Sequence, residues 1–390
     1  MKKVGIVSCY FIHSYGSMLQ AYATQKALTN LGYQNETINV SDFLPDLRKK
    51  QYGYILKSGI SSDIFRSRVV RGIALIRKKI MKTSYDKNIA VRDHRFDEFY
   101  EKFINLSEGG TLENLAGECK ERYSSILLGS DQLWLPQNIA ADYYTLRFAE
   151  AVNKVTYATS FGVSELPENI IENAKDFLSK IDSISVREQT GQRIVKELTG
   201  REVPILCDPT LLLTAAEWLE IQAKDPIVSE PYIFCYYFAE SMHEREKAKE
   251  LAKLTGCKLV CIPHLNYRIK GDDEYADIKI YNIGPEDWVN LVRNARYICT
   301  DSYHGTVFSI IYNKDFFIFR EGSKPDPMKY QSTSSRFESL LNAFDLKDRI
   351  LYGNVDLEKI LSSHIDYSKA EKTLGELRQQ AVDFLLSNLK

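Results

Sequence analysis

Short apolar runs alternate with amphipathic segments along most of the chain, and several of these runs end in small polar residues. Residues 4–9 form an apolar run of strand length, and the segment from about residue 18 to residue 31 has helical spacing. The same alternation returns in residues 124–207 and again in residues 232–320. Strands that alternate with helices predict parallel sheets flanked by helices. We therefore expect an α/β protein with two Rossmann-like, doubly wound domains that face each other across a cleft.

A proline-containing segment over residues 223–231 separates the two series of predicted elements. It predicts an N-terminal domain over residues 1–222 and a C-terminal domain over residues 223–365, which suits a chain of 390 residues. The tail, residues 366–390, has the pattern of an amphipathic helix. We expect this helix to pack back across the domains.

Residues 44–103 interrupt the alternation with helical segments, one of which is strongly basic. A basic amphipathic helix is typical of contact with anionic lipid headgroups or with a charged glycan carrier. A solvated helical insertion that covers the sheet is the more common arrangement. Both interpretations stay open for this stretch, whose cations are Arg66, Arg68, Arg71, Arg77, Lys78, Lys79 and Lys82.

The composition of the chain excludes some classes of function. The net charge is -1, so no overall positive field points to nucleic acid. Seven cysteines without a pairing pattern indicate reduced thiols in the cytoplasm, and the chain start has no signal-peptide pattern. Cys257 and Cys261 lie four apart without a second pair, so we expect no metal site. The predicted location is cytoplasmic, with peripheral contact at the inner membrane face left open by the basic stretch.

The most informative stretch is residues 300–306, which follows a short apolar run and precedes another of helical spacing. This pattern predicts strand, tight turn and helix, with His304 in the first helical turn. Ligands of open α/β sheets bind at the carboxyl ends of strands, and N–H groups at a helix start favour an anion. His304 is therefore a candidate acid beside an anion site. The alternative is local: Asp301 and Ser302 cap the helix, and His304 makes a hydrogen bond nearby.

Other strand ends offer further candidates. After the strand at residues 124–128, Asp131 is a candidate general base, Gln132 a hydrogen-bond donor and Trp134 a platform for a sugar ring, although Asp131 could equally be only a cap. Arg336, at a predicted helix start, suits bidentate capture of carboxylate or phosphate.

Six short motifs follow one another along nearly the whole chain. They are the Tyr-Gly-Ser within residues 11–20, Gly-Ser-Asp-Gln-x-Trp at 129–134, Tyr-Ala-Thr-Ser-Phe-Gly at 157–162, Ser-Val-Arg-Glu at 185–188, Asp-Pro-Thr at 208–210 and Thr-Asp-Ser-x-His-Gly-Thr at 300–306. Together, and in this order, they resemble the polysaccharide pyruvyl transferase family. The resemblance implies a two-domain GT-B-like fold, and the better studied members move a pyruvyl group from phosphoenolpyruvate to a sugar, which gives a cyclic ketal and phosphate.

The resemblance and the charge argument together assign roles to residues. His304 would protonate the methylene carbon of phosphoenolpyruvate, and Asp131, or Glu188 as a second choice, would accept the proton of the attacking hydroxyl. Arg187 has an alternative, an internal ion pair with Asp182 or Glu188. The donor-binding set is Arg336, Ser302, Gly305, Thr306 and Arg187, and the acceptor-binding set is Tyr15, Gly16, Ser17, Gln132 and Trp134.

The expected partners are phosphoenolpyruvate as co-substrate, with no bound cofactor, and a sugar acceptor. A lipid-linked oligosaccharide is one option for that acceptor, and the sequence leaves both its identity and the oligomeric state open. Two other functions stay open: a GT-B glycosyltransferase that uses a nucleotide sugar, and a non-catalytic glycan-binding member of the family.

Overall fold

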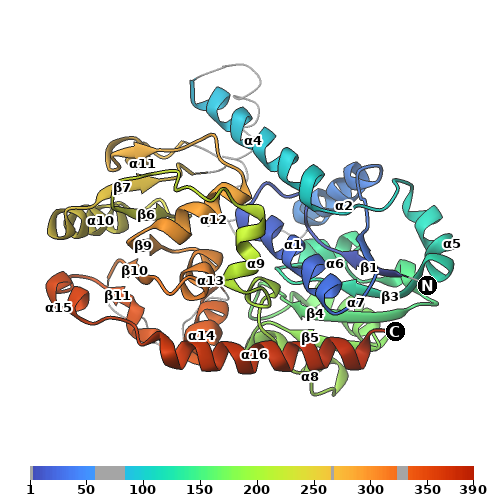
Figure 1. The fold of residues 1–390 in the computed structure, drawn as a ribbon. Helices are drawn as coiled ribbons and strands as arrows, with labels where there is room; N and C mark the ends of the chain where they lie inside the picture. The colour runs from blue at the N-terminus through green and yellow to red at the C-terminus, as the bar shows by residue number, and fades with distance from the viewer. Residues whose placement is uncertain (1–2, 58–83, 265–267, 323–332) are drawn as a thin grey trace.

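The computed structural model describes residues 3–57, 84–264, 268–322 and 333–390, which form two α/β domains (Figure 1). The first sheet has the strand order β2-β1-β3-β4-β5 and the second has the order β11-β10-β9-β6-β7-β8. All strand pairs in both sheets are parallel. The prediction of an α/β fold with two parallel sheets is confirmed.

The first sheet and its helices lie before residue 222. The elements are β1 (Lys3–Val7), α1 (Tyr15–Asn30), β2 (Asn35–Thr37), α2 (Leu44–Lys57), α4 (Ser84–Phe103), α5 (Leu112–Arg122), β3 (Tyr123–Leu128), α6 (Pro136–Ala141), β4 (Asn153–Thr159), α7 (Glu168–Ser179), β5 (Ser183–Val186), α8 (Gln189–Thr199) and α9 (Ala215–Trp218), with short 3-10 helices at Arg147–Ala149, Pro209–Leu211 and Leu219–Ile221.

The second sheet begins directly after the proline-containing segment. Its elements are β6 (Tyr232–Tyr236), α10 (Met242–Thr255), β7 (Lys258–Cys261), α11 (Lys270–Glu274), β8 (Ile278–Lys279), α12 (Pro285–Asn294), β9 (Tyr297–Thr300), α13 (Tyr303–Ile311), β10 (Asp315–Arg320), α14 (Thr333–Ala343), β11 (Ile350–Tyr352), α15 (Leu357–Ser362) and α16 (Tyr367–Asn388), with a 3-10 helix at Lys347–Arg349.

Helix α1 begins at Tyr15, with Ser14 in the extended conformation before it, and not at about residue 18 as predicted. Gly16 and Ser17 therefore belong to the first turn of a helix and not to a loop. The Ser17 hydroxyl donates to Asp131 Oδ2 at 2.7 Å. This earlier start brings both residues to the domain interface described below.

One large hydrophobic core runs through both domains, and a smaller core lies in the C-terminal domain. Aromatic side chains join the domains within the large core. The Tyr15 ring lies 4.7 Å from Phe96 and 6.0 Å from Trp288, and Trp218 lies 4.9 Å from Phe308, all between ring centroids. The two domains therefore share apolar packing.

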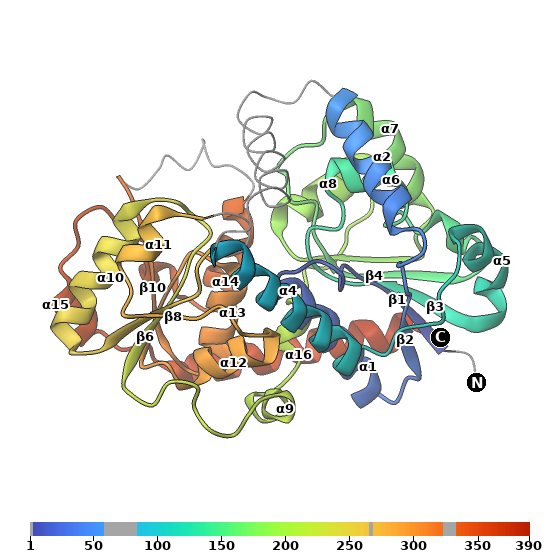
Figure 2. The same cartoon turned by 90° about the horizontal axis from the view of Figure 1, so that it is seen from above.

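Helix α4, part of the predicted insertion, lies between the two domains in the view from above (Figure 2). The Arg95 guanidinium donates to Glu286 at 2.9 Å and to Asp287 at 2.8 Å, both in the first turn of α12. Arg92, which is buried, donates to the carbonyl of Pro263 at 2.8 Å. Helix α4 of the N-terminal domain thus binds the C-terminal domain through charge-assisted hydrogen bonds.

His13, in the loop after β1, connects that loop to α4. Its ring stacks on Phe96, and its two nitrogens lie 3.1 Å from Asp93 Oδ1 and 2.9 Å from Asp97 Oδ1. Burial alone would lower the pKa of His13, but its hydrogen bonds to these two carboxylates outweigh the effect of burial and raise the pKa. Only the imidazolium can donate to both carboxylates at once.

We predict that this contact weakens as the pH rises. Because the folded-state pKa of His13 lies above its value of about 6.5 in an unfolded chain, its stabilising contribution is fully present below pH ~6.5 and is lost as the pH rises through the folded-state pKa. The contribution should be about 0.2–1 kcal/mol, since the His13 side chain is 33% exposed. Urea unfolding of the wild type and of His13→Asn at several pH values measures it. A difference between the two proteins that does not change with pH would contradict the prediction.

Helix α16 runs along the base of the molecule from the C-terminal domain to the N-terminal domain (Figure 1). Arg378, in its middle, donates to the carbonyls of Leu211 and Leu213 at 2.6 and 2.8 Å. Near its end, Asn388 accepts a hydrogen bond from Ser183, at the start of β5, at 2.6 Å. This helix is a second connection between the domains.

The cations from Arg66 to Lys82, on which the predicted membrane contact depends, lie outside the described residues. Within the part of the chain that the structure describes, no helix has the length and apolar character needed to cross a membrane.

Candidate active site

In each sheet the strand order reverses between two neighbouring strands, β1 and β3 in the first sheet and β6 and β9 in the second. Ligands of open α/β sheets bind at the carboxyl ends of strands beside such a reversal. The loop after β1 leads to Gly16, and the turn after β9 leads to His304. These two residues touch, because a Cβ added to Gly16 would lie 2.0 Å from His304 Nδ1. The two reversal points therefore meet at the domain interface.

The turn before α13 fixes the backbone of His304. Ser302 caps the helix by accepting a hydrogen bond from the Gly305 N–H at 3.2 Å, and the Thr306 hydroxyl donates to the Ser302 carbonyl at 3.2 Å. A side chain at Gly305 would meet Thr300 Oγ1 at 2.5 Å, so only glycine fits there. The groups of Ser302, Gly305 and Thr306 predicted to bind the donor are thus engaged inside the turn. Their contact with the donor stays a prediction from the sequence.

The His304 ring is held between two residues of the other domain. Gly16 covers its Nδ1 side, and Nε2 lies 3.6 Å from Asp208 Oδ2. Nε2 is buried and makes no hydrogen bond to any described residue. The nearby carboxylate favours a proton on Nε2, because Asp208 can only accept.

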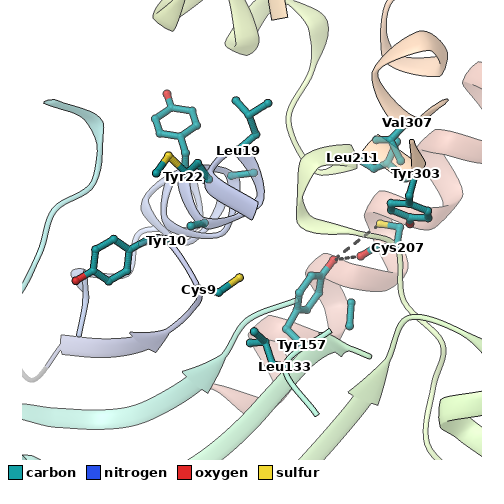
Figure 3. Packing of buried hydrophobic residues seen from close by; sticks show 14 of the residues in the cluster. Cys9, Tyr10, Leu19, Tyr22, Leu133, Tyr157, Cys207, Leu211, Tyr303 and Val307 are labelled. Carbon is teal, nitrogen blue, oxygen red and sulfur yellow. Dashed lines mark hydrogen bonds between the residues drawn. The ribbon is translucent and has the colours of Figure 1, made fainter. Parts of the chain in front are cut away.

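Asp208 connects residues from three elements. Its Oδ2 accepts from Arg187 Nη1 at 2.8 Å and from the Ser130 hydroxyl at 3.3 Å, and its Oδ1 accepts from the N–H of Thr210 at 3.0 Å. Burial alone would raise the pKa of Asp208, but His304 and Arg187 outweigh it and hold the pKa well below its usual range. Figure 3 shows Tyr157 bonding to Cys207, the residue before Asp208, through its hydroxyl and the Cys207 carbonyl at 2.9 Å. Asp208 is thus a rigid, fully ionised anchor.

Two guanidiniums gather beside this anchor, both over the ring of Tyr303: that of the buried Arg187 and that of the half-buried Arg336. Arg187 lies 4.8 Å and Arg336 lies 5.6 Å from the ring centroid. Burial lowers the pKa of Arg336, and the charge of Arg187 lowers it further. Among the described residues, Arg187 Nε and Nη2 and Arg336 Nε have no hydrogen-bond partner. Buried N–H donors of this kind suit an anion with carboxylate or phosphate oxygens.

Arg187 makes internal ion pairs, as the sequence left open. Its closest pair is with Asp208, and a longer one joins it to Glu188 at 3.9 Å, whereas Asp182 accepts instead from the N–H of Lys154.

Asp131 follows β3 with a φ of 86°, a left-handed conformation that is uncommon for aspartate. Its carboxylate accepts from the Ser17 hydroxyl at 2.7 Å and from the Gln132 N–H at 2.8 Å, and it lies 3.7 Å from Arg187. Burial alone would raise the pKa of Asp131, but Arg187 and His304 outweigh it and lower the pKa. Asp131 is therefore a stable anion and a weak base.

Glu188 differs from Asp131, because the pKa of Glu188 is raised and that of Asp131 is lowered. Its side chain is 1% exposed, and neither oxygen accepts a hydrogen bond from a described residue. Burial raises the pKa of Glu188, and the nearby Arg187 only partly opposes this. A carboxylate with a raised pKa accepts a proton more readily than Asp131 does.

Two residues predicted to bind the acceptor are core residues. Trp134 is fully buried, contacts the rings of Phe161 and Phe177, and donates its indole N–H to the Tyr144 carbonyl at 3.1 Å. Tyr15 is also fully buried, in the aromatic contact between the domains. Neither ring offers a free face for a sugar, so both are removed from the predicted acceptor site. Gly16 and Ser17 lie in the site, but they contact His304 and Asp131, and Gln132 is half-buried beside Asp131.

Asp208 and Tyr303 were not predicted as site residues. Both stand inside recognised motifs, so the signal was present, but their contacts join segments that are far apart in the sequence.

Two hollows on the described part of the chain lie away from this site. Hollows of about 570 Å³ and 880 Å³ lie near the amino ends of β1 and β2, at the sheet edge opposite to the carboxyl ends, and both are lined by Lys3 and Asn105. No group of three or more histidine, cysteine or acidic side chains among the described residues could hold a metal ion.

The fold is similar to that of UDP-N-acetylglucosamine 2-epimerases. The enzyme from Neisseria meningitidis, solved with UDP-GlcNAc, aligns with a TM-score of 0.51 and 10% identity over 100% of both chains. The enzyme from Methanocaldococcus jannaschii aligns with a TM-score of 0.51 and 12% identity over 99% of this chain and 100% of the other. At such low identity these matches establish a GT-B-like fold alone.

Comparison with protein families matches residues 15–323, most of the chain, to the family described as Polysaccharide pyruvyl transferase. No curated protein matches the chain. The matched segment contains the site residues up to Tyr303 and His304, whereas Arg336 lies beyond it.

Proposed function

Because this chain belongs to the polysaccharide pyruvyl transferase family, we propose that it transfers the pyruvyl group of phosphoenolpyruvate to two hydroxyls of a sugar. The products are a cyclic ketal on the sugar and free phosphate. The observation that supports this proposal best is the convergence of His304 Nε2 with the guanidiniums of Arg187 and Arg336 at the domain interface. Phosphoenolpyruvate needs the same combination, since it has a carboxylate, a phosphate and a carbon that must gain a proton.

Arg187 and Arg336 bind the anionic groups of the donor in this proposal. Their unpaired N–H groups match carboxylate and phosphate oxygens, and their burial strengthens each charge-assisted bond. Asp208 neutralises only part of this charge, since it bonds to Arg187 and not to Arg336. Arg336 is therefore the cation of the site that the described carboxylates neutralise least.

His304 acts as the acid. Nε2 gives its proton to the methylene carbon, so that positive charge develops at the carbon that bears the phosphate, and a sugar hydroxyl attacks that carbon. The departure of phosphate then lets a second hydroxyl attack the same carbon and close the ketal. One hydroxyl proton restores His304, and the base passes the other to the departing phosphate.

The base in this proposal is Glu188, whereas the sequence favoured Asp131. The low pKa of Asp131 suits a permanent anion that holds Ser17 and balances Arg187. The raised pKa of Glu188 suits a group that gains and loses a proton during turnover. The acceptor is a sugar of a polysaccharide or of its precursor, with a lipid-linked oligosaccharide as one option for the tests.

We predict that phosphoenolpyruvate stabilises the protein against heat and that a panel of nucleotide sugars does not. A ligand at a hundredfold excess over its Kd adds about 2.7 kcal/mol to the unfolding free energy. Arg336→Ala should lose this stabilisation, whereas His304→Gln should keep it and lose acceptor-dependent release of phosphate. Thermal unfolding and a phosphate assay measure both effects.

The matched control is Arg193→Ala, because Arg193 is an exposed arginine paired with Glu197 on α8 and should respond as the wild type does. Stabilisation by a nucleotide sugar alone would overturn the proposal and leave a GT-B glycosyltransferase. Binding of phosphoenolpyruvate without turnover on any sugar acceptor would leave a non-catalytic binding protein.

A further inference from the structure

Tyr303 contacts two like charges that come from different domains. Arg187 follows β5 of the N-terminal domain, and Arg336 lies in the first turn of α14 in the C-terminal domain. Their guanidinium carbons lie 4.8 and 5.6 Å from the centroid of the Tyr303 ring. A cation within about 6 Å of the face of an aromatic ring is attracted to it. One ring thus interacts favourably with both charges.

The two guanidiniums need such a partner. Arg187 and Arg336 repel each other, and this repulsion adds to the cost of their burial. Asp208 and, at 3.7 Å, Asp131 offset the charge of Arg187, but no close ion pair joins Arg336 to a described carboxylate. The charges of Asp131 and Glu188 act on both arginines, and the Tyr303 ring is a group that both guanidiniums contact directly.

The ring itself is fixed on several sides. Tyr303 is 6% exposed and is the first residue of α13. Its ring meets Phe337 edge-on at 6.1 Å and His304 edge-on at 5.3 Å between centroids. A ring held in this way cannot turn aside without disturbing α14 or His304. It can therefore hold the arginines in one arrangement.

We propose that Tyr303 is a positioning residue whose ring face holds Arg187 and Arg336 together as a preformed site for an anion with two charged groups. The ring acts through its electron-rich face, and its hydroxyl is not needed. The inference rests on the proposed function for the identity of that anion, phosphoenolpyruvate, but not for the presence of an anion site.

The test replaces Tyr303 with phenylalanine and with phenylalanines that carry an increasing number of ring fluorines. Fluorine withdraws electron density from the ring face and changes its shape little, so only the attraction to cations falls. Calorimetry measures the Kd for phosphoenolpyruvate and for inorganic phosphate. We expect Tyr303→Phe to bind within about twofold of the wild type, and the most fluorinated ring to bind about tenfold more weakly. Thermal unfolding shows that each variant is folded.

The matched control is the same series at Tyr275, a buried tyrosine whose ring lies 5.7 Å from Arg245. Arg245 has its own carboxylate, Asp272, at 2.9 Å, so fluorination there should leave anion binding unchanged. Affinities at position 303 that do not depend on the number of fluorines would overturn the inference, as would a wild-type protein that binds neither anion. A graded loss for phosphate in a protein that does not bind phosphoenolpyruvate would support the anion site and reject the proposed function.

Discussion

A Gly16→Ala variant should lose about 1–3 kcal/mol of unfolding free energy, although alanine is the better helix former. The new Cβ would lie 2.0 Å from Nδ1 and 2.5 Å from Cγ of His304, far inside contact distance. Neither side yields easily, because both residues are buried in the first turns of helices from different domains. The ring would also move relative to Asp208, so transfer activity should be lost. Urea unfolding and the phosphate assay measure the two effects.

Two controls separate this clash from a general effect of alanine. In a His304→Ala background the ring is absent, and Gly16→Ala should then stabilise α1 by about 0.5–1 kcal/mol. Gly117→Ala, inside α5, has nothing within 4 Å of the added Cβ and should stabilise by a similar amount. Additive effects of the changes at positions 16 and 304 would contradict the predicted contact.

Replacing Arg187 with methionine should cost about 3–5 kcal/mol, the usual loss when one partner of a buried ion pair is removed. The Asp208 side chain is 0% exposed and would keep its charge without the guanidinium at 2.8 Å. Methionine has a similar length, so the loss reports the charge more than the volume. Arg193→Met is the matched control, because the pair of Arg193 with Glu197 is exposed and should contribute at most about 1 kcal/mol.

The pH dependence identifies Asp208 as the cause. Its folded-state pKa lies below its value of about 3.9 in an unfolded chain, so its stabilising contribution is present above that pH and is lost as the pH falls through the folded-state pKa. The wild type and Arg187→Met should therefore differ most near neutral pH and become more alike in acid. Adding Asp208→Asn to the methionine variant should restore part of the loss. A difference that stays constant from pH 7 to pH 3 would assign the effect to packing.

The sequence was sufficient for features that depend on local pattern. Alternating apolar runs and helical spacing predicted the two parallel sheets, and the small polar residues of 300–306 predicted the strand, turn and helix around His304. Each of these features depends on residues within a few positions of one another. Periodicity and capping preferences contain that information.

The composition of the site could not be predicted in the same way. Trp134 stands in a polar motif, yet packing against Phe161 and Phe177 turns it into the core. Asp208 joins Arg187 to His304, and Tyr303 joins Arg187 to Arg336, across two domains. Such contacts depend on how the two domains pack against each other. The hydrophobic periodicity of a local segment does not indicate that packing.

The shared core also bears on engineering. Exchanging whole domains between relatives is a common way to transplant acceptor specificity, and it presumes that each half is an independent module. Here Tyr15 and Trp218 of one half pack against Trp288 and Phe308 of the other. A chimera that kept only one side of these contacts would expose aromatic surface and misalign Gly16 with His304. Acceptor specificity is therefore better transplanted through individual loops, with the interface left as a single inherited unit.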